Sequence, residues 1–96
     1  MNVLFHPEAE LEFNAAIDYY EEIEGGLGYD FSLEIASTIA RIIDLPKAWL
    51  VIEGEFRRAL VRRFPYGILY AEDQDNIYVV AVMHLHRAPE YWKHRI

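Results

Sequence analysis

The chain has 96 residues, of which 53% are hydrophobic and 15% aromatic, and its formal net charge is −7 at pH 7. This composition argues against disorder, and a chain this long buries roughly 60–65% of its unfolded surface, so we expect one domain over residues 1–96. No apolar run approaches the roughly 18 residues of a membrane span, and no basic segment precedes an apolar one at the start. We therefore expect a cytoplasmic protein. The absence of cysteine excludes disulfides and thiolate chemistry.

The charge is distributed unevenly along the chain. Residues 1–55 carry twelve acidic and two basic residues, whereas residues 56–96 carry seven basic and four acidic residues. A protein that binds along a phosphate backbone is typically basic overall. Direct nucleic-acid binding is therefore not expected, and any anion-binding surface must be local to the second half.

The first half of the chain predicts one strand and two helices. Residues 2–5 are an apolar run of strand length. Pro7 suits the first position of a helix, and apolar residues then recur at helical spacing for roughly sixteen residues. The glycines in residues 24–28 interrupt this pattern, and a second amphipathic helix follows them and ends near Asp44, because Pro46 disfavours its continuation. Two helices with so short a link must form an antiparallel hairpin.

Three strands are predicted in the second half, over residues 55–64, 68–72 and 77–86. Turns are expected at residues 65–67 and 73–76, and the last strand is apolar on both faces, which is typical of a central strand. The predicted fold class is α+β with the order β-α-α-β-β-β. In this fold the two-helix hairpin packs on a small, mostly antiparallel sheet.

Four stretches of this layout resemble the ParE/RelE superfamily of bacterial toxins, and they are nearer its ParE branch. In chain order they are "FHPEAELEFNAAIDYYEE", "GLGYDFSLEI", "RRALVRRFPYGILYAE" and "VVAVMHLHRAPEYW". Each stretch alone is weak, but all four in order span nearly the whole chain. The resemblance implies the toxin of a type II toxin–antitoxin module, in a hetero-oligomer with a cognate antitoxin.

The two branches share a fold but differ in activity, so residues must distinguish them. ParE-like toxins poison DNA gyrase without catalysis, and RelE-like toxins cleave messenger RNA in the ribosome. The resemblance favours the first activity, with DNA gyrase as the target, no cofactor and no metal. The expected target-binding surface is the basic and aromatic end of the chain, comprising Arg58, Arg62, Arg63, Arg87, Tyr91 and Trp92.

The alternative activity is a metal-independent endoribonuclease. RNA cleavage by the 2′-hydroxyl needs a base, an acid and cations on the developing charge. The candidate catalytic residues are Arg62, Arg63, Arg87 and Tyr91, with His84 or His86 as the base. RelE-type sites also use lysines in the sheet, yet residues 55–86 contain none. A third hypothesis is an inactive domain that only binds the antitoxin.

The histidines and the C-terminal residues also have purely structural interpretations. Strict strand alternation would place His84 and His86 on the same face as Tyr78, Val80 and Val82. A metal site formed by His84, His86 and His94 lacks a supporting carboxylate motif, so none is predicted. Tyr91 and Trp92 can instead pack the C-terminal tail on the sheet, with Arg87 as an ion-pair partner of that tail.

Overall fold

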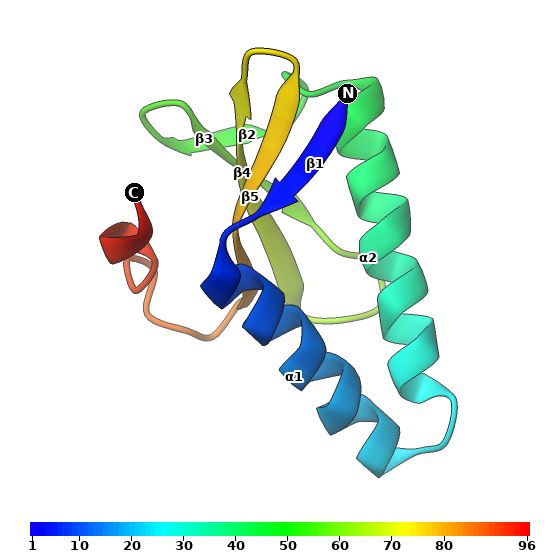
Figure 1. Cartoon of the computed structure of the whole chain (residues 1–96). Helices are drawn as coiled ribbons and strands as arrows, with labels where there is room; N and C mark the ends of the chain where they lie inside the picture. The colour runs from blue at the N-terminus through cyan, green and yellow to red at the C-terminus, as the bar shows by residue number, and fades with distance from the viewer.

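The computed structural model describes residues 1–96 and contains five strands, two α-helices and one 3₁₀ turn (Figure 1). In chain order these are β1 (Asn2–Phe5), α1 (Pro7–Ile23), α2 (Leu27–Asp44), β2 (Leu50–Glu53), β3 (Phe56–Leu60), β4 (Tyr66–Asp73), β5 (Asn76–His84) and η1 (Lys93–Arg95). No helix is long and apolar enough to cross a bilayer. The predicted α+β class and the order of the predicted elements are confirmed.

The five strands form one sheet in the order β1-β5-β4-β3-β2. β1 runs parallel to β5, and all other neighbouring strands are antiparallel. The helices α1 and α2 lie on one side of the sheet, and the C-terminal tail lies apart from α2 in Figure 1. The tail (residues 85–96) packs on the opposite face through Trp92.

Side chains cap the N-termini of both helices. At the start of α1, Nδ1 of His6 accepts a hydrogen bond from the Glu8 amide at 3.0 Å, and Pro7 occupies the first helical position. Gly26 precedes α2 with φ of 92°, a left-handed conformation that favours glycine. The Glu21 carboxylate of α1 accepts from the amides of Gly26 and Gly28, so one helix caps the other.

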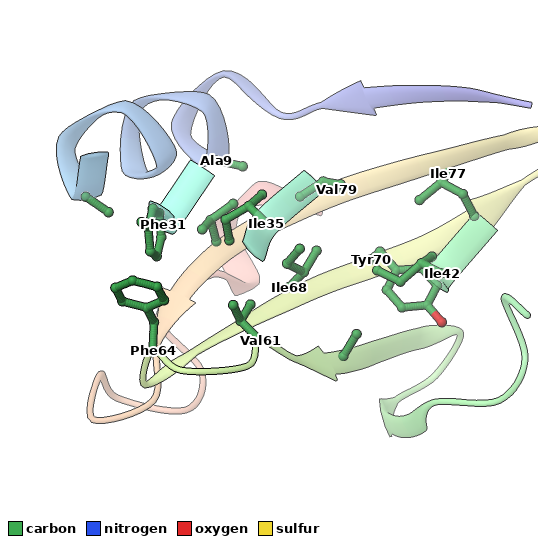
Figure 2. Close-up of a cluster of buried hydrophobic side chains, with 13 residues drawn as sticks. Ala9, Phe31, Ile35, Ile42, Val61, Phe64, Ile68, Tyr70, Ile77 and Val79 are labelled. Carbon is green, nitrogen blue, oxygen red and sulfur yellow. The ribbon is translucent and has the colours of Figure 1, made fainter. Parts of the chain in front are cut away.

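The main core lies between the helical hairpin and the sheet (Figure 2). α2 contributes Phe31, Ile35 and Ile42, which are spaced at four and seven residues and so share one helical face. The Phe31 ring packs edge-on against Phe64 at 5.2 Å between centroids. A second cluster on the other face of the sheet consists of Leu69, Val80, Ala81, Met83 and Trp92.

Several predicted strand boundaries were wrong, and the last strand, expected to reach residue 86, ends at His84. The strand expected at residues 55–64 ends at Leu60, because Val61 donates to the Tyr66 carbonyl and Arg63 adopts φ of 71° in the turn between them. The turn expected at residues 65–67 therefore comes earlier, and β4 begins at Tyr66. The edge strand β2 was not predicted, since its four residues are all exposed and show no alternation.

A β-bulge in β5 shows that the predicted orientation of His84 was wrong. His84 lies on the same face of the sheet as Val82 but not as Val80, and its ring packs against Tyr66. Tyr70 pairs with Val79, but Leu69 pairs with Ala81, so Val80 has no partner on β4. The extra residue moves later side chains to the other face. Val80 therefore lies in the tail-side cluster and Val82 in the helix-side core, although strict alternation would place them together.

Candidate functional site

The structure divides the predicted arginines into paired and unpaired side chains. Arg63 lies in the loop after β3 and forms exposed ion pairs with Asp30 and Glu34 of α2, at 3.5 and 3.8 Å. Arg58, Arg62 and Arg87 make no ion pair or side-chain hydrogen bond within the chain. The four candidate catalytic residues therefore do not form one hydrogen-bonded cluster.

Trp92 holds the C-terminal tail on the sheet. Its side chain is 1% exposed, its ring lies 5.7 Å from that of Phe56, and its indole N–H donates to the Pro89 carbonyl at 2.8 Å. A side chain so deeply buried cannot contact a partner directly. The prediction that Trp92 forms part of a target-binding surface is corrected to a packing role.

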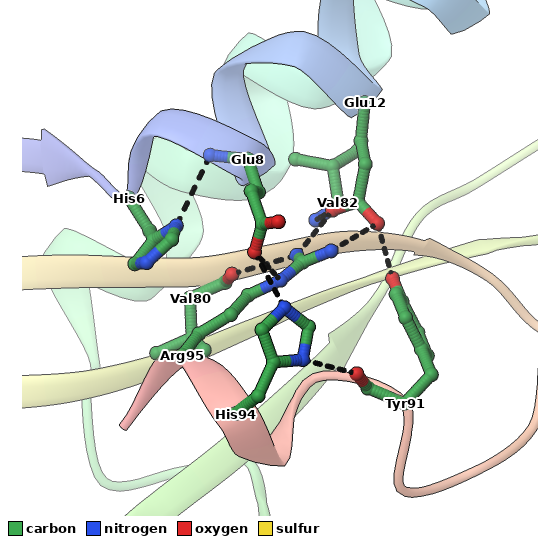
Figure 3. Close-up of polar contacts among 8 residues, drawn as sticks. All are labelled: His6, Glu8, Glu12, Val80, Val82, Tyr91, His94 and Arg95. Carbon is green, nitrogen blue, oxygen red and sulfur yellow. Dashed lines mark hydrogen bonds and ion pairs between the residues drawn. The ribbon is translucent and has the colours of Figure 1, made fainter.

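A buried ion pair fastens the end of the tail to α1 (Figure 3). The Arg95 guanidinium donates to both carboxylate oxygens of Glu12, at 2.7 and 3.1 Å. The Tyr91 hydroxyl donates to the same carboxylate at 2.6 Å. Burial and then the hydrogen bond to Glu12 raise the pKa of Tyr91 well above its ordinary value. Tyr91 is therefore a poor general base.

Glu12 and Arg95 also form hydrogen bonds with backbone groups of β5 that have no neighbouring strand. β1 pairs with β5 only as far as Val79, because the chain then turns into α1. Past that point, the Val82 amide donates to Glu12 at 3.1 Å, and the Val80 carbonyl accepts from Arg95 at 3.1 Å. Two backbone groups beside the bulge thus find side-chain partners instead of a strand, as buried polar groups require.

His94 and Glu8 form a more exposed contact beside the buried pair. His94 Nε2 lies 2.7 Å from Glu8 Oε2, and Arg95 Nε lies 3.0 Å from the same oxygen. The hydrogen bond from His94 lowers the pKa of Glu8 below its ordinary value. His94 thus belongs to the contacts of α1, whereas His84 and His86 have their rings 5.0 Å apart at the end of β5.

A cavity of about 220 Å³ opens between α1 and the end of β5. Most of its lining residues are apolar or aromatic, and three are charged or polar. The residues that line it are Glu12, Ala15, Ala16, Tyr19, Tyr66, Val82, His84 and Arg87. It is the place where Arg87 and His84 come together, which strict alternation along the strand would not have predicted.

Sequence reasoning missed Glu12 and Arg95, the two residues that position this region. Glu12 lies among the acidic residues of α1, yet its side chain is 15% exposed and that of Arg95 is 6% exposed. The available signal was weak: Glu8 and Glu12 are four residues apart on one face of α1, and His94 and Arg95 end the chain. The expected ion pair of Arg87 is replaced by stacking, since its guanidinium lies 4.0 Å from the Tyr91 ring centroid.

Comparison with known proteins supports the fold directly. No protein-family model matches the chain, and no curated protein sequence matches it. Among solved structures, the chain is similar to one described as the chromosomal ParDE TA system from P. aeruginosa, with a TM-score of 0.77 at 12% identity. The match covers 90% of this chain and 97% of that chain. The chain has a ParE-like fold.

This ParE-like fold confirms the layout that the resemblance implied. The strand before the helical hairpin and the three strands β3, β4 and β5 are present in the expected order. At 12% identity the likeness establishes the architecture alone. Activity has to be argued from the side chains.

Proposed function

We propose that the chain is the ParE-like toxin of a type II toxin–antitoxin module, acting in the cytoplasm and neutralised by a cognate antitoxin. The observation that carries this proposal is the structural match to a ParDE system across 90% of the chain. Four stretches of the sequence support the same family independently. The toxin acts by binding a protein target, and DNA gyrase is the target class that the ParE branch implies.

Binding rather than catalysis is favoured by the way the candidate catalytic residues are engaged. The Tyr91 hydroxyl donates a hydrogen bond to Glu12, and Arg63 forms ion pairs with two acids of α2. α1, which shares a cavity with Arg87, carries six acidic residues and no basic one, so its surface would repel an RNA phosphate. These features argue against a ribosome-dependent nuclease.

The proposed target-binding surface consists of the unpaired arginines Arg58, Arg62 and Arg87, with the edge of Tyr91. The stem of Arg58 lies over Gly67, where an added Cβ would meet its Cγ and Cδ at 3.0 Å. Guanidinium groups without internal partners keep all their donors for a partner's carboxylates or carbonyls. Trp92 and Arg95 serve this surface as positioning residues, because they hold the tail that carries Arg87 and Tyr91.

The antitoxin is proposed to cover the exposed apolar edge of the sheet. β2 is the outermost strand, so one row of its backbone groups has no strand neighbour. Its side chains Leu50, Val51 and Ile52 are 67%, 45% and 38% exposed. An extended segment of the antitoxin can pair with this edge and bury all three.

An apolar groove at the other edge of the sheet offers a second contact for the antitoxin. It lies between β1 and α1, has a volume of about 380 Å³, and is lined in part by Val3, Leu4, Phe5 and Phe13. Glu10 of α1 also lines it, so a basic amphipathic antitoxin segment fits it by charge as well as by apolar area.

Inducible expression in a bacterial host without antitoxin tests the proposal. Messenger RNA integrity, DNA replication and cell shape are followed together. Filamentous cells with intact transcripts and stalled replication are the expected result. Rapid transcript cleavage would overturn the binding mechanism in favour of the nuclease. Normal growth, with folded protein confirmed, would leave only an inactive domain that binds antitoxin.

Two variants refine this experiment. Arg87→Gln removes a guanidinium from the proposed surface and should weaken toxicity, whereas Arg41→Gln removes one from α2 and should not. Arg41 bonds only to Ser37 and Thr38 of its own helix, so it is a matched surface control. Equal toxicity of both variants would exclude Arg87 from the target-binding surface.

A further inference from the structure

The cavity between α1 and the end of β5 contains hydrogen-bond donors that the protein itself does not use. Arg87, one of the residues that line it, forms no ion pair within the chain, and its guanidinium lies over the face of the Tyr91 ring. A guanidinium in this setting keeps its charge and its planar donors available. The lining of the cavity therefore carries one positive charge without an acidic partner.

His84 supplies a second unused donor. Its Nδ1 accepts a hydrogen bond from the His86 amide at 3.1 Å. In a neutral imidazole the proton must then reside on Nε2. That Nε2–H has no partner within the chain, and the ring is held edge-on against Tyr66 with centroids 5.2 Å apart.

Tyr66 supplies a third donor. Its hydroxyl has no hydrogen-bond partner in the chain, although the side chain is half-buried. Burial raises the pKa of Tyr66, and the charges of Tyr20, Tyr19 and Glu12 act in the same direction. Tyr66 lines the cavity together with Tyr19 and Glu12.

Glu12, the only acid in the lining, does not accept hydrogen bonds from Arg87, His84 or Tyr66. Its Oε1 accepts from the Val82 amide and Arg95, and its Oε2 accepts from Tyr91 and Arg95. Its charge is neutralised by the Arg95 guanidinium, which is 6% exposed. Figure 3 shows this carboxylate directed at the tail. The donors of the cavity are thus left for an external acceptor.

We infer that this cavity is a binding site for a monocarboxylate whose apolar body is no larger than about one amino-acid residue. Arg87 and His84 Nε2 would hold the carboxylate, and the Tyr66 hydroxyl would donate to it or to its neighbouring polar group. Ala15, Ala16 and Val82 would contact the apolar body. The site does not depend on the chain being a toxin.

Charge selects a carboxylate over a nucleic acid. One free guanidinium matches one negative charge, and the lining holds no second permanent cation that is unpaired. A phosphodiester chain would bring further charges against the acidic surface of α1, where repulsion would oppose it. A single carboxylate, from a chain terminus, an acidic side chain or a small acid, avoids this cost.

The test is an NMR titration of the ¹⁵N-labelled full chain with three probes of similar size. N-acetyl-phenylalanine presents a terminal carboxylate, N-acetyl-glutamate α-amide a side-chain carboxylate, and phenyl phosphate a phosphate. The neutral N-acetyl-phenylalanine amide is the control. We expect a carboxylate probe to bind at about 1–10 mM and to shift the amides of Ala16, Val82 and His84. The carboxylate probe that binds more tightly shows whether the site prefers a terminal or a side-chain carboxylate.

Matched variants decide whether the site is the one described. Arg87→Gln should weaken carboxylate binding at least about tenfold, and Arg41→Gln should leave it unchanged. The dispersed spectrum of each variant reports its folding. Binding of the neutral amide as tight as that of the carboxylates would overturn the inference. So would a preference for phenyl phosphate, shifts spread over the whole surface, or carboxylate binding that survives Arg87→Gln.

Discussion

Glu12 and Arg95, separated by 83 positions in the chain, form a bidentate ion pair with contacts of 2.7 and 3.1 Å. The pair joins the first turns of α1 to the last turn of the tail and also satisfies the edge of β5. It fixes the position of Tyr91, on which Arg87 stacks. The geometry of the proposed target-binding surface therefore depends on two residues that are not part of it.

Glu12→Ala should lower the free energy of unfolding by about 3–5 kcal/mol, because it removes the buried carboxylate that Arg95 contacts through two nitrogens and leaves only the more exposed Glu8 beside Nε. The Tyr91 hydroxyl and the Val82 amide lose their acceptor as well. Urea denaturation followed by circular dichroism measures the change. Glu10→Ala, an exposed position on the same helix, should stay within about 0.5 kcal/mol of the wild type. A similar loss in both variants would contradict the role of Glu12.

Trp92→Ala should cost about 3–5 kcal/mol, since it empties a buried site between the tail and the sheet. The milder Trp92→Phe should lose less and keep the domain folded for measurement. Tyr29→Ala removes an aromatic side chain that is 65% exposed and serves as the control. If Trp92→Ala and Tyr29→Ala had equal midpoints in urea, the tail would not be anchored as described.

The contact between Glu8 and His94 should make the free energy of unfolding depend on pH in the acidic range. The pKa of Glu8 is lowered in the folded state from its ordinary value of 4.5, so its contribution is present above that pH. The contribution is lost as the pH falls from 4.5 through the lower folded pKa. Wild type and Glu8→Gln should therefore differ in unfolding free energy at neutral pH and converge in acid. Glu22→Gln, an exposed site without an ion pair, should show no such convergence.

Gly28→Ala should destabilise the helical hairpin by about 1–3 kcal/mol, the usual cost of overpacking. A Cβ at this position would lie 2.5 Å from the Ile17 carbonyl oxygen, which belongs to the backbone of α1 and cannot move alone. Gly25→Ala is the control, because its nearest contact would be a side-chain oxygen at 3.9 Å. Thermal unfolding of the two variants measures the difference. Equal melting temperatures would show that the helices separate at little cost.

Local patterns explain why much of the fold was predictable. Pro7, the glycines of residues 24–28 and Pro46 act on the chain next to them, so they set helix ends without knowledge of the rest. α1 begins at Pro7 and α2 ends at Asp44, as predicted. Apolar spacing likewise predicted that both helices are amphipathic, and α2 buries Phe31, Ile35 and Ile42 in the core.

The bulge at Val80 and the buried pair of Glu12 and Arg95 were decided by tertiary structure. A bulge depends on which residue of β4 lies opposite, and the sequence of β5 alone carries no sign of the extra residue. In the sequence, Glu12 cannot be distinguished from the exposed glutamates near it in α1. Its side chain is buried only because the C-terminal tail packs against it. The sequence by itself determined the two helices, four of the five strands and the order of these elements, because they follow from local propensity and spacing. Tertiary structure determined which arginines remain unpaired, because a charge finds its partner only when distant segments meet.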